Sequence, residues 1–497
     1  MSTPSSSALA QAGRLVMVNI TGTELDAEQA QFLREHHIRA VCVFRRNLGS
    51  EDQIRRLTAQ LREVMGPQAL IGIDQEGGSV VRATSLPQPP AAMALGAVGD
   101  DALAQAVGAA VARGVRHLGF NWNFAPVLDV NNNPANPVIG ERSFSADPQQ
   151  VARLAGAWMR GALSEGVACC VKHFPGHGDT HVDSHHDLPV VDKSLSALRA
   201  LELLPFEALA ARAPAVMTAH IVYPQLDPEH PATLSRRILG GLLREELGYD
   251  GVVITDALEM KAIHDRYGHA RAAVMTLQAG ADMAMALGPM EEQRAAVLAL
   301  AEAIDGGVLP PARVQRALQR LDELAARYPA GASAYPAAQR QDDEGLMRRA
   351  WGAALCTVGD ARPPAAGAPL RVVTQASVAC DGVSEAGLPA EQVRSLFDGF
   401  ADVELVTVPD LGALPAGALP MDHRVNVLVS NQRKRYPAGA PRRGAALHIA
   451  LWNPFHAADV DAPTVVTWGY ADGALQALKD WLHGRLQPQA TAPAPLR

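Results

Sequence analysis

The stretch GVVITDALEM (residues 251–260) opens with a run of β-branched and apolar residues and reaches an acidic side chain, Asp256, where that run ends. Val and Ile favour extended backbone, and a run that is apolar along its whole length is typical of a parallel strand buried on both faces. The same pattern recurs along the chain. We therefore predict strands at residues 16–20, 40–44, 70–74, 120–128, 167–173, 215–221, 251–256 and 281–287.

Ala-, Leu- and Arg-rich stretches with helical periodicity separate several of these strands. Examples are DALAQAVGAAVARGVRHLG (101–119) and PQQVARLAGAWMRGALSEG (148–166). Eight strand–helix units within roughly the first 330 residues predict an α/β fold of the (β/α)8 TIM-barrel type. A doubly wound parallel sheet is the structural alternative, because periodicity alone does not distinguish the two.

Polar residues stand where the predicted strands end. Asp74 ends the third strand, Lys172 and His173 the fifth, His220 the sixth and Asp256 the seventh. The carboxyl ends of the strands in a parallel barrel meet on one face, and active sites are built there. We therefore expect these side chains to surround one site.

The overall composition excludes several classes of protein. The chain has 497 residues and a net charge of -8, so nothing in its charge indicates nucleic-acid binding. Its five cysteines form no CxxC pair, and an odd number argues against a disulfide framework. The N-terminus does not resemble a signal peptide, and no segment has the roughly eighteen uninterrupted apolar residues of a membrane span. We expect a cytoplasmic protein without membrane contact.

The composition changes after about residue 330, where Pro-, Ala- and Gly-rich stretches indicate linkers. Apolar runs such as RVNVLVSN and TVVTWGY then alternate with a helical segment, GALQALKDWLHG. We predict a barrel domain over residues 1–335 and a smaller, sandwich-like α/β domain over 345–488. The tail, 489–497, is rich in Pro and Ala, and we expect it to be disordered.

The segment KHFPGHGDTHVDSHHD (172–187) holds five histidines and three aspartates. His177 and His181 are four apart, the spacing of a helical zinc pair. Pro175, Gly176 and Gly178 oppose a helix there, and without it the two rings do not share a face. A metal-free catalytic loop is therefore favoured over a metal site or an inert polar loop.

The motif KHFPGHGDTHVDSH (172–185) resembles the signature of glycoside hydrolase family 3, in its β-N-acetylglucosaminidase branch. Four further motifs resemble the family in the same order. They are IDQEGGSVVR (73–82), NFAPVLDV with GERSFSADP, MTAHIVYPQLD with PATLS, and GVVITDALEM (251–260). This resemblance covers most of residues 15–300 and independently implies a barrel.

The resemblance implies a retaining hydrolysis through a covalent glycosyl-enzyme. Asp256 matches the family nucleophile, although an Asp in this position can also be a helix N-cap. His185 of the triplet Asp183-Ser184-His185 matches the acid/base of this branch. Imidazole titrates near neutral pH, so it can give and take a proton, and Asp183 would orient it and stabilise its protonated form.

The resemblance also implies residues that hold the sugar: Asp74, Arg82, Arg142, Lys172 and His173. Their alternative role is a structural salt bridge. Glu76 lies near Asp74, but the sequence does not show whether it also holds the sugar. His177 is expected to shape the loop. No role is assigned to His181 and His186.

The main hypothesis is an exo-acting β-N-acetylglucosaminidase that trims N-acetylglucosamine from peptidoglycan fragments, without cofactor or metal, and as a monomer. A phosphorylase or another β-glycosidase of the same family is the nearest alternative. A metal-dependent hydrolase built on the histidines and a carbohydrate-binding protein without activity are alternatives of different classes.

Overall fold

The computed structural model describes residues 4–185, 187–380, 383–415, 417–436 and 444–496. An eight-stranded sheet in this part of the chain has the order β10-β1-β2-β3-β6-β7-β8-β9, and every pairing in it is parallel. Its strands are β1 (Val16–Asn19), β2 (Ala40–Val43), β3 (Leu70–Ile73), β6 (Trp122–Asn123), β7 (Ala168–Phe174), β8 (Ala215–Thr218), β9 (Val252–Thr255) and β10 (Ala284–Met285).

The two ends of this sheet meet, and the sheet forms a barrel. A parallel bridge joins Ile254 of β9 to Met283, next to β10, and the amide of Thr255 donates to the carbonyl of Met283 at 3.2 Å. The predicted TIM-type barrel is confirmed, and the doubly wound alternative is excluded because an open sheet does not close on itself.

The fourth predicted strand is shorter than expected. Within residues 120–128 only Trp122 and Asn123 pair as a strand. Pro126 has no amide hydrogen to donate to a neighbour. The side chain of Asn121 replaces part of the ladder by accepting from the amide of Ile71 at 2.7 Å. The eighth strand is likewise reduced to β10, two residues long.

Helices surround the barrel because each presents one apolar face to it. In α3 (Glu51–Met65), Ile54, Leu57, Leu61 and Met65 are buried at three- and four-residue spacing, and Ser50 caps the N-terminus by accepting from the amide of Gln53. The other helices on the barrel are α1 (Ser6–Arg14), α2 (Ala27–Glu35), α4 (Ala92–Val98), α5 (Asp101–His117), α6 (Pro148–Ser164), α7 (Leu195–Ala200), α8 (Leu204–Leu209), the π-helix η5 (Arg237–Glu246), α9 (Lys261–Tyr267), α10 (His269–Ala279), α11 (Met290–Asp305) and α12 (Pro311–Arg327).

The second domain is built on a six-stranded sheet of order β11-β16-β15-β14-β12-β13, in which only β11 is antiparallel to its neighbour. The strands are β11 (Cys356–Val358), β12 (Leu370–Gln375), β13 (Val403–Val408), β14 (Val425–Ser430), β15 (Leu447–Ala450) and β16 (Thr464–Val466). Val427 and Val429 pack with Trp481 on one face, and Val373 and Leu428 pack with Leu411 on the other. The elements beside the sheet are α14 (Ala390–Arg394), α15 (His456–Asp459) and α16 (Asp472–Leu482).

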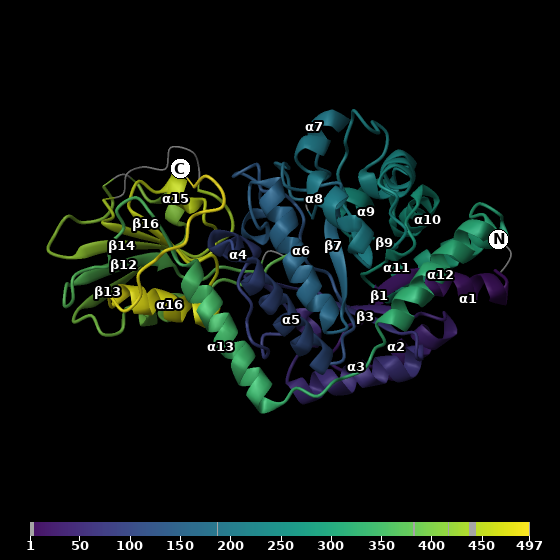
Figure 1. Ribbon diagram of the computed structural model, residues 1–497, viewed down its shortest axis with the longest axis horizontal. Helices are drawn as coiled ribbons and strands as arrows, with labels where there is room; N and C mark the ends of the chain where they lie inside the picture. Colours follow the sequence, from purple (N-terminus) through teal and green to yellow (C-terminus); the bar gives the residue numbers. More distant parts are fainter. Residues whose placement is uncertain (1–3, 186, 381–382, 416, 437–443, 497) are drawn as a thin grey trace.

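Helix α13 (Ala337–Ala354) runs between the two domains and packs on both α5 and α16 (Figure 1).

The last residues return to the barrel, so the prediction of a disordered tail is wrong for 489–496. The carbonyl of Pro493 accepts from the amide of Ala146 at 3.1 Å and from the Ser145 hydroxyl at 2.8 Å, and Leu496 is buried. The amino-acid composition of a segment does not show whether it packs against residues distant in the sequence. Of the helices in the described part of the chain, none is both long and apolar enough to cross a membrane.

Candidate active site

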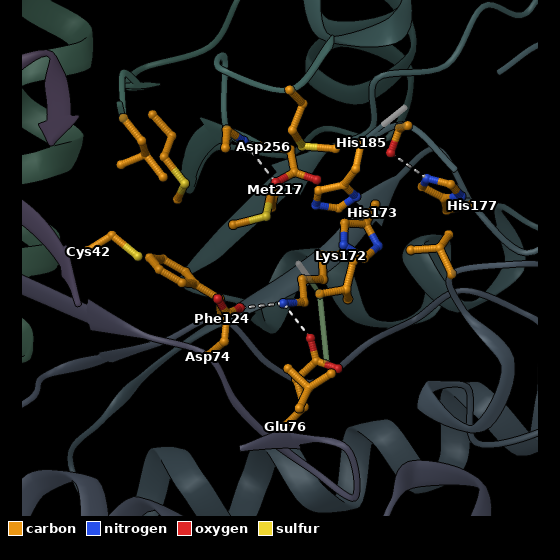
Figure 2. Close-up of a pocket in the computed structure, with 18 of the residues that line it drawn as sticks. Cys42, Asp74, Glu76, Phe124, Lys172, His173, His177, His185, Met217 and Asp256 are labelled. Atoms are coloured by element: carbon orange, nitrogen blue, oxygen red, sulfur yellow. Dashed lines mark hydrogen bonds and ion pairs between the residues drawn. The ribbon is translucent and has the colours of Figure 1, made fainter. Parts of the chain in front are cut away.

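A cavity of about 330 Å³ opens at the carboxyl ends of the barrel strands (Figure 2). Apolar side chains form part of its wall, among them Cys42, Phe124, Met217, Met285 and Leu287. Every predicted site residue except Asp183 also lines it, namely Asp74, Arg82, Arg142, Lys172, His173, His185 and Asp256. The other strand-end residues thus come together as expected, and His220 is buried, with its ring bonded to the backbone of Ala257.

Asp256 follows β9 directly and lies in the turn that precedes α9. Its Oδ1 accepts from the amide of Ala257 at 2.8 Å, and α9 begins only at Lys261, so Asp256 is not a helix N-cap. Burial raises the pKa of this carboxyl, but the nearby rings of His173, His220 and His185 outweigh that effect and lower it. Asp256 is therefore held as a carboxylate at neutral pH.

His220, which the sequence placed at a strand end without a role, supports this turn. Its Nε2 donates to the carbonyl of Ala257 at 2.9 Å, directly after Asp256. Its pKa is lowered, first by burial, so the neutral ring is favoured. The ring fixes the backbone that carries the carboxylate.

Asp183 and His185 form a close pair at the edge of the cavity. The ring Nδ1 of His185 donates to Asp183 Oδ1 at 2.8 Å, and the same oxygen accepts from the His185 amide at 2.9 Å. Burial lowers the pKa of His185, but the Asp183 carboxylate and, more weakly, Asp256 raise it above its ordinary value. Burial also raises the pKa of Asp183, yet the hydrogen bond and charge of His185 lower it to about 2.

The loop that carries this pair is anchored by His177, which is buried. Its Nδ1 lies 2.9 Å from Thr180 Oγ1, and its Nε2 lies 3.2 Å from Ser184 Oγ, between Asp183 and His185. Burial, and then the charge of His173, lower the pKa of His177 to about 4. His177 therefore stays neutral and holds the loop, as the sequence suggested.

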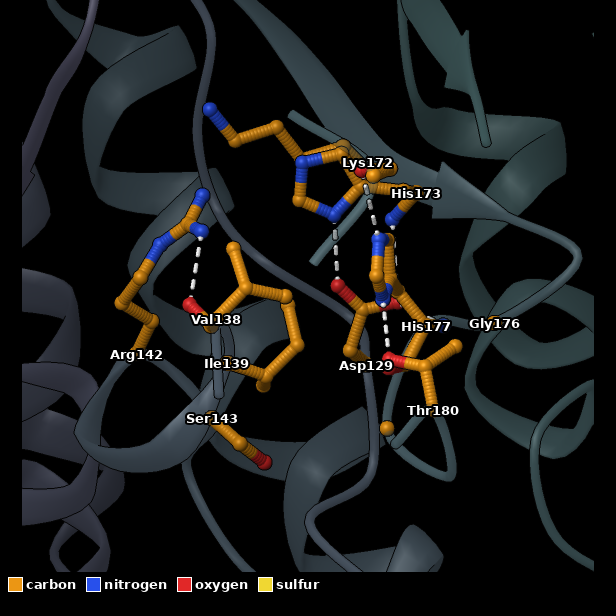
Figure 3. A network of polar contacts seen from close by, with 12 residues as sticks. Asp129, Val138, Ile139, Arg142, Ser143, Lys172, His173, Gly176, His177 and Thr180 are labelled. Carbon is orange, nitrogen blue, oxygen red and sulfur yellow. Dashed lines mark hydrogen bonds and ion pairs between the residues drawn. The ribbon is translucent and has the colours of Figure 1, made fainter. Parts of the chain in front are cut away.

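Asp129 is a buried carboxylate that sequence reasoning missed. Its Oδ2 accepts from His173 Nδ1 at 2.6 Å, and its Oδ1 accepts from the amides of His173 at 3.1 Å and His177 at 2.6 Å (Figure 3). Burial raises its pKa, but the charge of His173 and these hydrogen bonds lower it. The only sequence signal was an Asp at the end of an apolar run, NFAPVLD.

Glu76, to which the sequence analysis gave no role, is the central anion of a charged network at the cavity. It accepts from Arg142 Nε at 2.9 Å and Nη2 at 2.8 Å, and Lys172 Nζ lies 2.6 Å away. Burial raises its pKa, and Arg142 and Lys172 lower it well below its usual range. Glu76 follows the end of β3, in β4 (Gln75–Gly77), a hairpin strand paired with β5 (Val80–Val81).

Asp74 and Arg82 complete this network. Lys172 Nζ donates to Asp74 Oδ1 at 2.8 Å, while Arg82 Nη2 lies 3.9 Å from Asp74 Oδ2. Arg82 Nη1 instead donates to Glu385 of the second domain at 2.9 Å. Salt bridges therefore hold Lys172, Arg82 and Arg142, and their side chains nonetheless line the cavity.

The remaining histidines of the loop do not join the site. His181 is exposed, and its Nδ1 lies 3.2 Å from Asn133 Nδ2. His186 lies outside the described residues. In the described ranges, no three His, Cys, Asp or Glu side chains converge as a metal site would require.

Comparison with known proteins places the barrel in one family. The family model described as Glycosyl hydrolase family 3 N terminal domain matches residues 10–324. A β-hexosaminidase of Pseudomonas aeruginosa (strain LESB58) is 39% identical over 309 residues, covering 61% of this chain and 90% of its own. A β-hexosaminidase of Stenotrophomonas maltophilia (strain K279a) is 39% identical over 283 residues, covering 55% of this chain and 84% of its own.

Two solved structures are also similar to this chain. The family 3 β-N-acetylglucosaminidase of Paenibacillus sp. str. FPU-7 matches 98% of both chains with a TM-score of 0.84 at 34% identity. NagZ of Neisseria gonorrhoeae, in complex with N-trifluoroacetyl-D-glucosamine, matches 67% of this chain and 98% of its own, with a TM-score of 0.57 at 31% identity. The first of these likenesses includes the second domain, since it spans nearly the whole chain.

Proposed function

Because the chain belongs to glycosyl hydrolase family 3 and is a glycoside hydrolase, we propose that it is a retaining exo-β-N-acetylglucosaminidase. It would remove terminal β-linked N-acetylglucosamine from larger saccharides. The names of the relatives support this choice, as does the N-acylated glucosamine bound to the Neisseria protein. The cavity is of a size to enclose a sugar unit.

Asp256 is the proposed nucleophile. Its carboxylate attacks the anomeric carbon and forms a glycosyl-enzyme ester as the bond to the aglycone oxygen breaks. The lowered pKa keeps it ionised, which an attacking carboxylate requires. The strand-end position and the bonds around Ala257 hold it rigidly, so little reorganisation accompanies the attack.

His185 is the proposed acid and base. Its Nδ1–H is engaged by Asp183, which leaves Nε2 to protonate the departing aglycone oxygen. The neutral ring then takes a proton from the water that hydrolyses the ester, and the enzyme returns to its starting state. The raised pKa favours the protonated ring needed for the first step.

The sugar would be oriented by polar residues that line the cavity, namely Asp74, Arg82, Arg142, Lys172 and His173. Lys172 and Arg142 both form salt bridges with Glu76, and His173 is oriented by Asp129. Fixed donors and acceptors of this kind hold the anomeric carbon in line with Asp256.

The natural substrate we propose is a peptidoglycan fragment with N-acetylglucosamine at its non-reducing end, hydrolysed in the cytoplasm. The family branch that the motifs resemble carries this part of the proposal. Comparing purified muropeptides with chitin oligosaccharides as substrates would test it, and equal or better hydrolysis of the chitin fragments would argue against it.

The observation that carries the proposal is the placement of Asp256 and the Asp183–His185 pair at one cavity. The test is release of nitrophenol from 4-nitrophenyl β-N-acetylglucosaminide near neutral pH, with a chelator present. Wild type should turn over and Asp256→Asn should be inactive. Inhibition of the wild type by the chelator, or full activity in Asp256→Asn, would contradict the proposal.

A further inference from the structure

The second domain reaches the cavity at Val383, the first residue of the segment 383–385. Val383 lines the cavity and packs against three apolar barrel residues, Val80, Val138 and Ile139. The segment is therefore part of the site's wall as well as a contact between domains.

Main-chain bonds fix this segment to both domains. The amide of Glu385 donates to the carbonyl of Ser79 in the barrel at 3.1 Å, and the hydroxyl of Tyr470 in the second domain donates to the carbonyl of Glu385 at 3.0 Å. Ser79 in turn donates to Glu141 at 2.6 Å, which also accepts from Trp452 Nε1 at 2.9 Å. The Glu385 side chain thus projects from a backbone that both domains hold.

Arg82 is the partner of that side chain. It is buried, and Nη1 donates to Glu385 Oε1 at 2.9 Å, whereas Nη2 lies 3.9 Å from Asp74 Oδ2, beyond hydrogen-bond distance. Within the described part of the chain, Arg82 Nε has no hydrogen-bond partner. A buried guanidinium with this few bonds would move to the nearest other acceptor if Glu385 were neutral.

The nearest other carboxylate is Asp74. Its Oδ1 accepts from Lys172, while among the described residues its Oδ2 has no hydrogen bond, and Arg82 Nη2 lies 3.9 Å from it. Asp74 lines the cavity and lies next to Lys172 (Figure 2), so its second oxygen is placed to accept from a sugar hydroxyl. A full Arg82–Asp74 bond would occupy it.

We infer that Glu385 is a positioning residue for sugar binding: it holds Arg82 away from Asp74 Oδ2 and so keeps that oxygen available to a sugar hydroxyl. The second domain thereby takes part in recognition of the sugar without touching the reacting atoms. This inference rests on the proposed function, because it concerns the same sugar.

Steady-state kinetics of the full chain on 4-nitrophenyl β-N-acetylglucosaminide test the inference. Glu385→Gln should raise KM about tenfold, the cost of one charge-assisted hydrogen bond to the sugar, with kcat changed less than about threefold. Glu385→Asp keeps the charge and should recover most of the affinity. The side chain is 26% exposed, so both variants are compatible with folding, and thermal melting checks this.

A double-mutant cycle distinguishes an effect of Glu385 on the position of Arg82 from an effect on the contact between the two domains. In an Arg82→Met background, Glu385→Gln should change KM less than about twofold, since Glu385 acts through Arg82. Asp459→Asn is the matched control, because Asp459 pairs with Arg435, which bonds the barrel carbonyl of Pro134 away from the cavity. It should leave KM at the wild-type value.

Three outcomes would overturn the inference in an active wild type. They are an unchanged KM in Glu385→Gln, an equal rise in the Arg82→Met background, or a loss confined to kcat. A wild type that releases no nitrophenol would instead contradict the proposed function itself. The two failures are therefore distinguishable in one experiment.

Discussion

One oxygen of Asp183 accepts both the backbone amide and the ring Nδ1–H of His185, at 2.9 and 2.8 Å. The two residues are separated only by Ser184, whose hydroxyl contacts the buried ring of His177. The orientation of His185 is thus set by its own loop, and the loop is set by the barrel. Among the described residues, the hydrogen bonds that orient His185 come from Asp183 of the barrel domain.

Replacing Asp183 by Asn should shift the pH dependence of the reaction. The carboxylate raises the pKa of His185, so its loss lowers that pKa, and the alkaline limb of the kcat/KM profile should move to lower pH. At neutral pH, kcat should fall by roughly a hundredfold, as weakened general acid catalysis predicts. The measurement is the pH profile of nitrophenol release.

Asp187→Asn is the matched control, since Asp187 lies on the same loop with its side chain 70% exposed. An alkaline limb that stays in place in Asp183→Asn, or moves equally in both variants, would contradict the role given to Asp183.

His177 should make the folded protein sensitive to acid. Its pKa is about 4 in the fold against 6.5 unfolded, so the neutral ring's contribution is complete above pH 6.5 and is lost as the pH falls toward 4. Linkage then predicts a loss on the order of 2 kcal/mol in the free energy of unfolding at pH 5. His177→Gln, which does not titrate, should lose less on acidification.

Urea unfolding of wild type and His177→Gln at pH 7.5 and pH 5 measures this difference. His181→Gln serves as the control, because His181 is exposed and should behave as wild type does. The same pH sensitivity in all three proteins would show that other groups carry the effect.

Gly178 should be required for the loop to reach its position. A Cβ there would lie 1.6 Å from the carbonyl oxygen of Val130, so Gly178→Ala must displace the segment between His177 and Asp183. A displacement of about 1 Å can cost roughly a hundredfold in rate, and we expect that loss in kcat/KM. Nitrophenol release together with a melting curve would measure it.

Gly241→Ala is the comparison, since nothing lies within 4 Å of its added Cβ in η5. If Gly178→Ala retained wild-type kcat/KM, the tight contact with Val130 would have no bearing on the site.

The barrel was predictable because Val- and Ile-rich runs recur and polar residues stand at their ends. The local sequence pattern does not predict the length of a strand where a side chain takes the place of a backbone hydrogen bond between strands, as the Asn121 side chain does in the fourth strand. The roles of Asp129 and Glu76 were not predicted for a related reason. Each role depends on a partner distant in the sequence, His173 for Asp129 and Arg142 for Glu76. The tail and Glu385 depend on tertiary contacts that composition does not encode.

We propose that Asp256 carries the sugar while His185 moves the proton. The most direct test is intact-protein and peptide mass spectrometry of His185→Ala incubated with 2,4-dinitrophenyl β-N-acetylglucosaminide, whose leaving group needs no acid. We predict one N-acetylglucosaminyl adduct on the peptide that contains Asp256, released when azide is added. No adduct, or an adduct on another residue, would contradict the account.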